Sequence, residues 1–215
     1  MPTVKKSDLD YFLYAVTDFP SYPHLDPVDS VRQTLLGGTG IVQLREKYRD
    51  TAEIAALAKR IIPVCRGFNA CFIVNYDVEA ALISGADGVH VGQHDTSLSE
   101  ARLRLGPDRI VGVSVQTVGQ AVKACRGGAD YLGVGAVFPT STKTDADSVS
   151  LETLKRICDV STVPVVAIGG VNLDNMDRLA GSGNRGVSIV SAIFAAEDIR
   201  LASAALYEKS KKLFS

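Results

Sequence analysis

Eight short apolar segments constrain the fold of this chain more than any other feature of its sequence. Each segment is nearly continuous in apolar or small residues and does not alternate with polar ones, which is typical of parallel strands buried on both faces. The expected strands are residues 12–17, 41–44, 71–75, 88–91, 110–115, 131–137, 164–168 and 186–190.

Helical patterns lie between these strands. The expected helices are residues 51–64, with Thr51 as the N-cap, and residues 117–125, 151–158, 173–180 and 202–213. The tripeptide Gly-Ala-Asp occurs at residues 85–87 and again at residues 128–130, each time just before an expected strand. It indicates a glycine at the C-terminal end of a helix, followed by a tight return to the sheet.

The alternation of strands and helices predicts a closed fold. Eight strand–helix units in 215 residues give about 27 residues per unit, close to the roughly 30 expected of a βα unit. We therefore expect an α/β fold, the (β/α)8 TIM barrel with eight parallel strands, which leaves no sheet edge exposed. An open doubly wound sheet is the alternative, but it usually carries a glycine-rich first turn, and the first turn here is Asp18-Phe19-Pro20-Ser21. No linker or shift of composition divides the chain, so one domain over residues 1–215 is expected.

Charge and composition exclude several classes of protein. The 23 Lys and Arg residues nearly balance the 24 Asp and Glu residues, so no overall positive field favours nucleic acid. No apolar segment approaches the roughly 18 residues that span a bilayer, and the N-terminus does not resemble a signal peptide. The spacing of the four cysteines fits neither a metal site nor a dense disulfide scaffold. We expect a cytoplasmic protein with no nucleic-acid or membrane partner, and a homo-oligomer is compatible with this sequence.

A cluster of cations follows the second expected strand. Because side chains alternate along a strand, Gln43, Arg45 and Lys47 are expected on the same side. Arginine grips a phosphate through two parallel hydrogen bonds and lysine adds a point charge, so the three residues predict an anion site. The alternative is a solvated strand end in which Arg45 pairs with Glu46.

Carboxylates follow the third and fourth strands. Asn75, Asp77 and Asp95 are expected at the mouth of the barrel, where chemistry lies in this fold. Carboxylates beside a phosphate cluster suggest Mg²⁺, which takes one or two carboxylates together with phosphate oxygens. Each aspartate has an alternative role as a helix cap.

Further anion-binding groups follow strands six to eight: Lys143 is expected to join the side of Gln43–Lys47, and Gly170 and Ser191 are expected to form a second anion site. Thr140, Ser141, Thr142 and Lys143 lie in a long loop that offers three hydroxyls and a cation, although a plain hydroxyl-rich loop is the alternative. Gly169-Gly170 and Val190-Ser191 end the seventh and eighth strands, where barrels often hold a phosphate at a helix N-terminus. Two phosphate-bearing substrates, or one bisphosphate, would fit the two sites.

Three motifs together resemble the thiamin phosphate synthase family. They are Gln43-Leu44-Arg45-Glu46-Lys47, Gly88-Val89-His90-Val91-Gly92-Gln93 and Pro139-Thr140-Ser141-Thr142-Lys143, and the similarity runs from Tyr14 to Phe194. The resemblance implies a transferase of thiamine biosynthesis. It would join hydroxymethylpyrimidine diphosphate to a thiazole phosphate, with Mg²⁺, to give thiamin phosphate and pyrophosphate.

The resemblance also implies site residues. The pyrimidine diphosphate would contact Gln43, Leu44, Arg45, Glu46, Lys47, Asn75, Ser114 and Lys143. The thiazole phosphate would contact Thr140, Ser141, Thr142, Gly170, Val190 and Ser191. Arg45, Lys47 and Lys143 would be catalytic, because negative charge grows on the departing pyrophosphate and no nucleophile is needed.

One position departs from the family pattern. The family places a Mg²⁺ carboxylate directly after the asparagine, and this chain has Tyr76 there, with Asp77 next. A phenol, with a reference pKa of about 10, is a poor ligand at neutral pH. Asp95 and Asp77 are the expected metal ligands, with three alternatives open: Asp77 substitutes for the missing carboxylate, Mg²⁺ is held by Asp95, pyrophosphate and water, or activity is reduced.

Two rival functions remain open from the sequence. A related barrel enzyme, a thiazole tautomerase, would not need to bind a diphosphate; the Gln43–Lys47 motif with Lys143 argues against it, and Tyr76 weakly favours it. A non-catalytic barrel that binds a phosphate metabolite is the second, and Tyr76 is the feature that favours it. His90 is expected to be a hydrogen-bonded packing residue inside its strand and not a general base.

Overall fold

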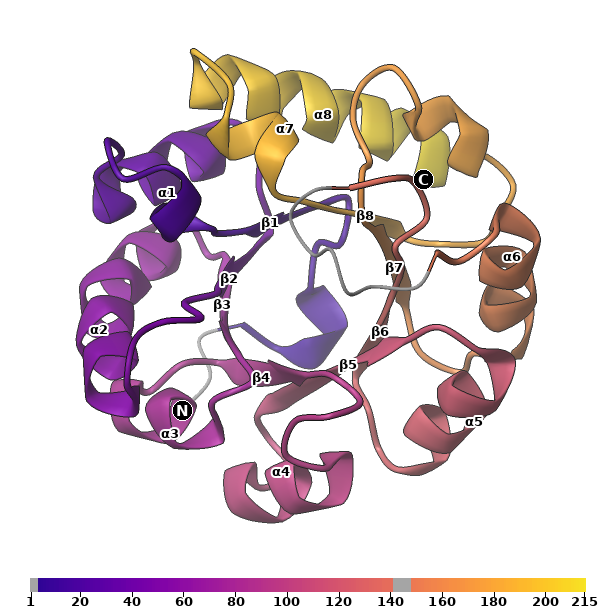
Figure 1. The fold of residues 1–215 in the computed structure, drawn as a ribbon, viewed down its shortest axis with the longest axis horizontal. Helices are drawn as coiled ribbons and strands as arrows, with labels where there is room; N and C mark the ends of the chain where they lie inside the picture. The colour runs from indigo at the N-terminus through magenta and orange to yellow at the C-terminus, as the bar shows by residue number, and fades with distance from the viewer. Residues whose placement is uncertain (1–3, 141–147) are drawn as a thin grey trace.

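Eight parallel strands close into a barrel in the part of the chain that the computed structural model describes, residues 4–140 and 148–215 (Figure 1). The strands are β1 (Leu13–Val16), β2 (Ile41–Leu44), β3 (Cys71–Asn75), β4 (Gly88–Val91), β5 (Ile110–Val115), β6 (Tyr131–Val134), β7 (Val165–Ile168) and β8 (Gly186–Ile189). Each strand pairs with the next, and β8 returns to β1 with Ile189 beside Ala15. This closure confirms the expected (β/α)8 barrel and excludes the open sheet.

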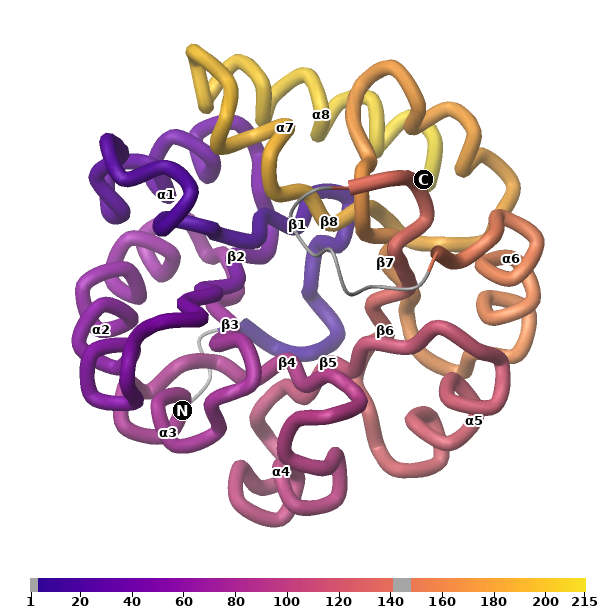
Figure 2. Tube along the Cα trace, viewed as in Figure 1, coloured from indigo at the N-terminus to yellow at the C-terminus, as the bar shows by residue number. Residues whose placement is uncertain are grey.

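Helices form a ring around the barrel (Figure 2). They are α1 (Pro27–Leu36), α2 (Thr51–Gly67), α3 (Val78–Ser84), α4 (Leu98–Leu105), α5 (Val118–Arg126), α6 (Leu151–Val160), α7 (Ser191–Phe194) and α8 (Ile199–Phe214). Three short 3₁₀ helices, η1 (Lys6–Asp8), η2 (Phe19–Ser21) and η3 (Met176–Leu179), lie in the connections. Among the described residues, no helix is both long enough and apolar enough to cross a bilayer.

Two expectations about helices were wrong. The expected helix 173–180 is only the 3₁₀ turn η3, because neighbouring asparagines bind the backbone that a helix would use: Asn172 accepts from the backbone N–H groups of Asp174 and Asn175. The N-cap of α2 is Asp50 and not Thr51, since Asp50 and Glu53 form a reciprocal capping box. The Thr51 hydroxyl instead donates to Asp77 at 2.7 Å.

The strands separate two apolar layers. One layer fills the space between the strands and the helices, and it includes Leu13, Leu44 and Phe72. The other fills the inside of the barrel and contains Tyr14, Ile73 and Tyr131 among others. Inward positions of the strands carry side chains into the barrel, and near the carboxyl ends these positions include Gln43, Asn75 and Ser114.

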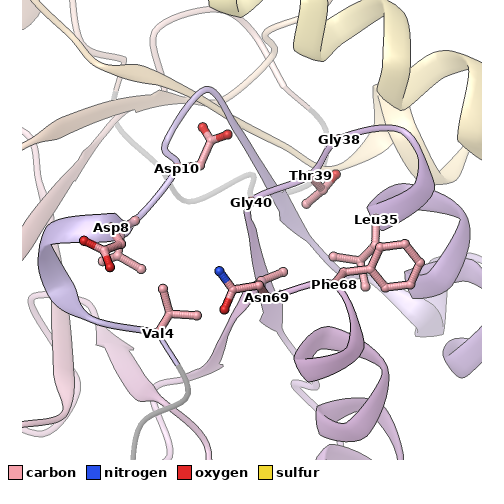
Figure 3. A pocket seen from close by; sticks show the side chains of 11 residues that line it. Val4, Asp8, Asp10, Leu35, Gly38, Thr39, Gly40, Phe68 and Asn69 are labelled. Carbon is pink, nitrogen blue, oxygen red and sulfur yellow. The ribbon is translucent and has the colours of Figure 1, made fainter.

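The amino-terminal end of the barrel is covered by the chain's own start. Figure 1 shows the segment that contains η1 crossing the barrel opening, and Lys6 binds both Pro107 and Asp130 on the far side of that opening. A pocket remains between this segment and the starts of β2 and β3 (Figure 3). It lies at the end opposite to the expected active site.

Candidate active site

Polar side chains from three strands lie at the carboxyl end of the barrel. Gln43 is the third residue of β2, Asn75 ends β3, and Ser114 is the fifth residue of β5. The Asn75 amide donates to the Gln43 carbonyl oxygen at 2.8 Å. All three lie where the chemistry of such barrels takes place, so the structure brings the expected pyrimidine-site residues Gln43 and Asn75 into direct contact.

Arg45 is fixed beside this cluster by the connection after β1. Its backbone N–H donates to the Thr17 hydroxyl at 3.0 Å, and its guanidinium lies 3.4 Å from an Asp18 carboxylate oxygen. The side chains of Arg45 and Asp18 are only 12% and 15% exposed, so the cation is held in place and partly withdrawn from water. A positive charge held in this way is suited to an anionic ligand.

The side chains of the other residues in the Gln43–Lys47 motif lie in different environments. Leu44 is buried in the layer between the strands and the helices, and Lys47 is exposed. Glu46 is buried and pairs with Arg49 at 3.1 Å, so the alternative pairing of Glu46 with Arg45 is not what forms. Burial raises the pKa of Glu46, and the Arg49 charge opposes that shift.

The carboxylates expected to hold Mg²⁺ have structural roles of their own. Asp77 is the N-cap of α3, with one oxygen accepting from the Ala80 N–H at 2.8 Å and the other from Thr51. Asp95 is exposed, and one of its oxygens accepts from the Gly92 N–H at 2.7 Å. The cap alternative therefore describes Asp77, whereas the N-cap of α4 is Ser97.

Tyr76 directly precedes Asp77 and feels the charges of both carboxylates. It has a positive φ of 52°, which is rare for a bulky residue, and its hydroxyl donates to the Glu46 carbonyl at 3.2 Å. Burial raises the pKa of Tyr76, and the charges of Asp77, Asp95 and Glu46 raise it further. The phenol is therefore neutral at pH 7 and does not replace the missing carboxylate.

The donor set fits a Mg²⁺ ion that is shared with a substrate. No group of three His, Cys, Asp or Glu side chains in the described residues could hold a metal alone, and both Asp77 oxygens are already hydrogen-bonded. Asp95 offers one exposed carboxylate. One carboxylate with phosphate oxygens and water is a usual Mg²⁺ environment, so the residues fit such a site and do not fit a site built by the protein alone.

The residues expected to bind the second phosphate follow β6, β7 and β8. Gly170 has a φ of +66°, and a Cβ there would approach the Pro139 carbonyl oxygen to 2.2 Å, so only glycine fits. Val190 precedes α7, and Ser191 is its first residue. Thr140 is half-buried next to Pro139. Ser141, Thr142 and Lys143 lie outside the described residues, and their roles stay predictions.

Sequence reasoning missed the aromatic residues under the mouth. The Gln43 amide donates to the Tyr14 hydroxyl at 2.5 Å, and Tyr14 shares a 2.7 Å hydrogen bond with Tyr131. His90 bonds both Tyr131 and Ser114, which confirms that it is a hydrogen-bonded packing residue. Tyrosine at inward strand positions was the available signal, because a buried phenol needs a partner.

Comparison with known proteins identifies the family of this chain. The family model described as thiamine monophosphate synthase matches residues 13–193. A thiamine-phosphate synthase of Ruminiclostridium cellulolyticum is 43% identical over 203 residues, which cover 94% of this chain and 97% of the relative. One from Methanospirillum hungatei is 43% identical over 91% of this chain and 95% of its own.

A solved structure extends this similarity to three dimensions. The thiamine phosphate pyrophosphorylase from Pyrococcus furiosus superimposes with a TM-score of 0.88 at 36% identity, over 96% of this chain and 98% of that one. Fold, motifs and sequence identity thus agree over nearly the whole length. The chain is a transferase that belongs to the thiamine monophosphate synthase family.

Proposed function

We propose that this chain joins hydroxymethylpyrimidine diphosphate to a thiazole phosphate, giving thiamin phosphate and pyrophosphate. The observation that carries the proposal is the contact between Gln43 and Asn75, beside the constrained cation Arg45. These are residues that the family resemblance assigns to the pyrimidine diphosphate. The relatives are themselves described as thiamine-phosphate synthases.

The reaction needs charge stabilisation more than a nucleophile. The bond between the pyrimidine methylene carbon and the diphosphate oxygen breaks, and its electron pair leaves with pyrophosphate. The thiazole nitrogen then supplies the pair for the new C–N bond. Arg45, Lys47 and Lys143 stabilise the negative charge on pyrophosphate, and the barrel mouth holds the two rings in line. Mg²⁺ would neutralise part of the same charge when it is bound at Asp95.

The second phosphate has its own place in this proposal. Gly170, Val190 and Ser191 lie at the ends of β7 and β8, and Thr140, Ser141 and Thr142 would complete the site. Backbone N–H groups at the start of a helix favour an anion. We propose that the thiazole phosphate binds there.

Pyrophosphate release by the purified protein tests the proposed function. The protein is given both substrates and Mg²⁺, and each of the three is omitted in turn. Release that requires all three, together with thiamin phosphate as product, is the expected result. Absence of release would overturn the proposal, and isomerisation of a thiazole phosphate precursor in the same preparation would identify a tautomerase instead.

Replacement of Tyr76 by aspartate is expected to lower the Mg²⁺ concentration that gives half the maximal rate. The change adds a carboxylate next to Asp95, and aspartate tolerates a positive φ better than tyrosine does. Tyr76→Asn is the matched control, since asparagine has the same size and backbone tolerance without the charge. Binding of Mn²⁺ in the presence of pyrophosphate, followed by electron paramagnetic resonance, gives a readout besides activity. Equal metal affinity in the two variants would contradict this prediction.

A further inference from the structure

A chain of hydrogen bonds runs beneath the candidate site through six of the eight strands. From Asn75 it passes to Gln43 at 2.8 Å and to Tyr14 at 2.5 Å. It continues from Tyr14 to Tyr131 at 2.7 Å, from Tyr131 to His90 Nδ1 at 2.8 Å, and from His90 Nε2 to Ser114 at 2.8 Å. Both ends of the chain are residues that the proposed function assigns to the pyrimidine diphosphate.

The middle of this chain is closed to water. Tyr14 is 1% exposed, Tyr131 is fully buried, and His90 is 7% exposed. Burial raises the pKa of both phenols well above their ordinary value, so each tyrosine keeps its proton and can donate one hydrogen bond. In such a dry interior a polar group without a partner is costly, and every proton in the chain therefore needs an acceptor.

These constraints determine which group donates and which accepts in each hydrogen bond of the series. The Gln43 amide nitrogen donates to the Tyr14 oxygen, so Tyr14 must give its own proton to Tyr131, its other hydrogen-bond partner in the described part of the chain. Tyr131 accepts that bond and donates to His90 Nδ1. A neutral imidazole that accepts at Nδ1 carries its proton at Nε2, and this proton goes to the Ser114 oxygen. The Ser114 proton is then left for an acceptor that is not part of this series of hydrogen bonds.

We infer that Tyr14, Tyr131 and His90 are positioning residues of the enzyme, which fix the Gln43 amide and make the Ser114 hydroxyl a hydrogen-bond donor to the diphosphate substrate. The inference rests on the proposed function for the identity of that substrate. It does not make His90 a general base, because both ring nitrogens are engaged within the chain.

The strand register shows how His90 and Tyr131 come close enough to form their hydrogen bond. His90 of β4, Gly112 of β5 and Tyr131 of β6 lie in one row across the sheet. The glycine between them has no side chain, and a Cβ there would approach the Tyr131 ring to 2.1 Å. The absence of this one atom lets His90 and Tyr131 meet over β5.

Tyr131→Phe is the variant that interrupts the chain with the least change of shape. It removes the hydroxyl that joins Tyr14 to His90, so the tautomer of His90 and the donor role of Ser114 are no longer fixed. We expect kcat to fall about 10-fold, the effect of losing one well-placed hydrogen bond, with little change in the KM for the thiazole phosphate. Tyr11→Phe is the matched control, because its ring packs on Tyr131 with centroids 5.8 Å apart, and it should leave kcat unchanged.

A double-mutant cycle separates positioning from a merely structural role. If Tyr131 acts in part through Ser114, the Tyr131→Phe change should lower kcat less once Ser114 is alanine, because only its effect through Gln43 then remains. An equal loss of kcat in both backgrounds would overturn the inference. Should Tyr131→Phe fold poorly, His90→Gln and His90→Met provide a second pair. Glutamine can accept from Tyr131 and donate to Ser114 as histidine does, so it should retain more activity than methionine, and equal activity would contradict the inference.

The tautomer of His90 can be measured without substrate. The chain has three histidines, so the ¹⁵N signals of His90 can be assigned in a labelled sample by comparison with His90→Gln. We expect a proton on Nε2 and none on Nδ1 in the wild type. A proton on Nδ1 would overturn the inference even if the enzyme is active. Failure of pyrophosphate release with the expected tautomer would instead count against the proposed function.

Discussion

Replacement of Arg45 by alanine is expected to lower kcat about 10²–10³-fold, the usual cost of removing one electrostatic contact to charge that develops in a transition state. The structure gives a reason for a loss of kcat this large. The guanidinium is held by Asp18, and the Arg45 backbone is held by Thr17. The cation is therefore already in position when charge grows on pyrophosphate.

The matched control for Arg45 is another arginine with an acidic neighbour. Arg60 of α2 lies 3.9 Å from Asp26, and both side chains are about 60% exposed, so Arg60→Ala removes the same charge from the surface and should leave kcat unchanged. Arg45→Lys should fall between the wild type and Arg45→Ala, because lysine keeps the charge and loses the two-pronged geometry. Steady-state pyrophosphate release measures all three variants. A kcat for Arg45→Ala within threefold of the wild type would remove Arg45 from the catalytic group.

The strands were predictable because a strand that is buried on both faces needs a short, continuous run of apolar residues, which the local sequence shows directly. Four of them, β2 to β5, begin and end at the predicted residues. The prediction for 131–137 was too long, since β6 ends at Val134. Beyond Val134, the backbone N–H groups of Val137 and Phe138 still donate to the carbonyl oxygens of Ile168 and Gly169 at the end of β7. These residues are apolar and hydrogen-bonded like strand residues, so their sequence cannot be distinguished from that of a strand.

The sequence predicted which residues form the candidate site, but it did not predict which ion pairs and hydrogen bonds they make. Alternation along β2 indicated that Gln43 and Arg45 share a side, but nothing local showed that Asp18 fixes Arg45 or that Glu46 pairs with Arg49. Hydrogen bonds between residues that are 29 to 117 positions apart, such as those of Tyr14 with Gln43 and Tyr131, depend on closure of the barrel. A pattern within one strand carries no information about them.

The role of Gly112 is a consequence of that closure, and its replacement by alanine is expected to destabilise the protein. The added Cβ would lie 2.1 Å from Cζ and 2.4 Å from the hydroxyl oxygen of Tyr131. That ring cannot move aside easily, because it is fully buried against Tyr14 and His90, with ring centroids 5.7 and 5.4 Å away. Overpacking of a well-filled core costs about 1–3 kcal/mol, which lowers Tm by roughly 3–10 °C in a chain of this size.

Thermal unfolding of Gly112→Ala should be compared with that of Gly67→Ala. Gly67 is the last residue of α2, and a Cβ there meets no atom within 4 Å, so its replacement should change Tm little. A second cycle tests the assigned cause. In a Tyr131→Leu background the steric conflict is relieved, and Gly112→Ala should cost less than it does in the wild type. The double variant would still lack the hydroxyl that joins Tyr14 to His90, so its kcat should stay low while part of the stability returns. An equal cost of Gly112→Ala in both backgrounds would show that the conflict with Tyr131 is not what glycine avoids at this position.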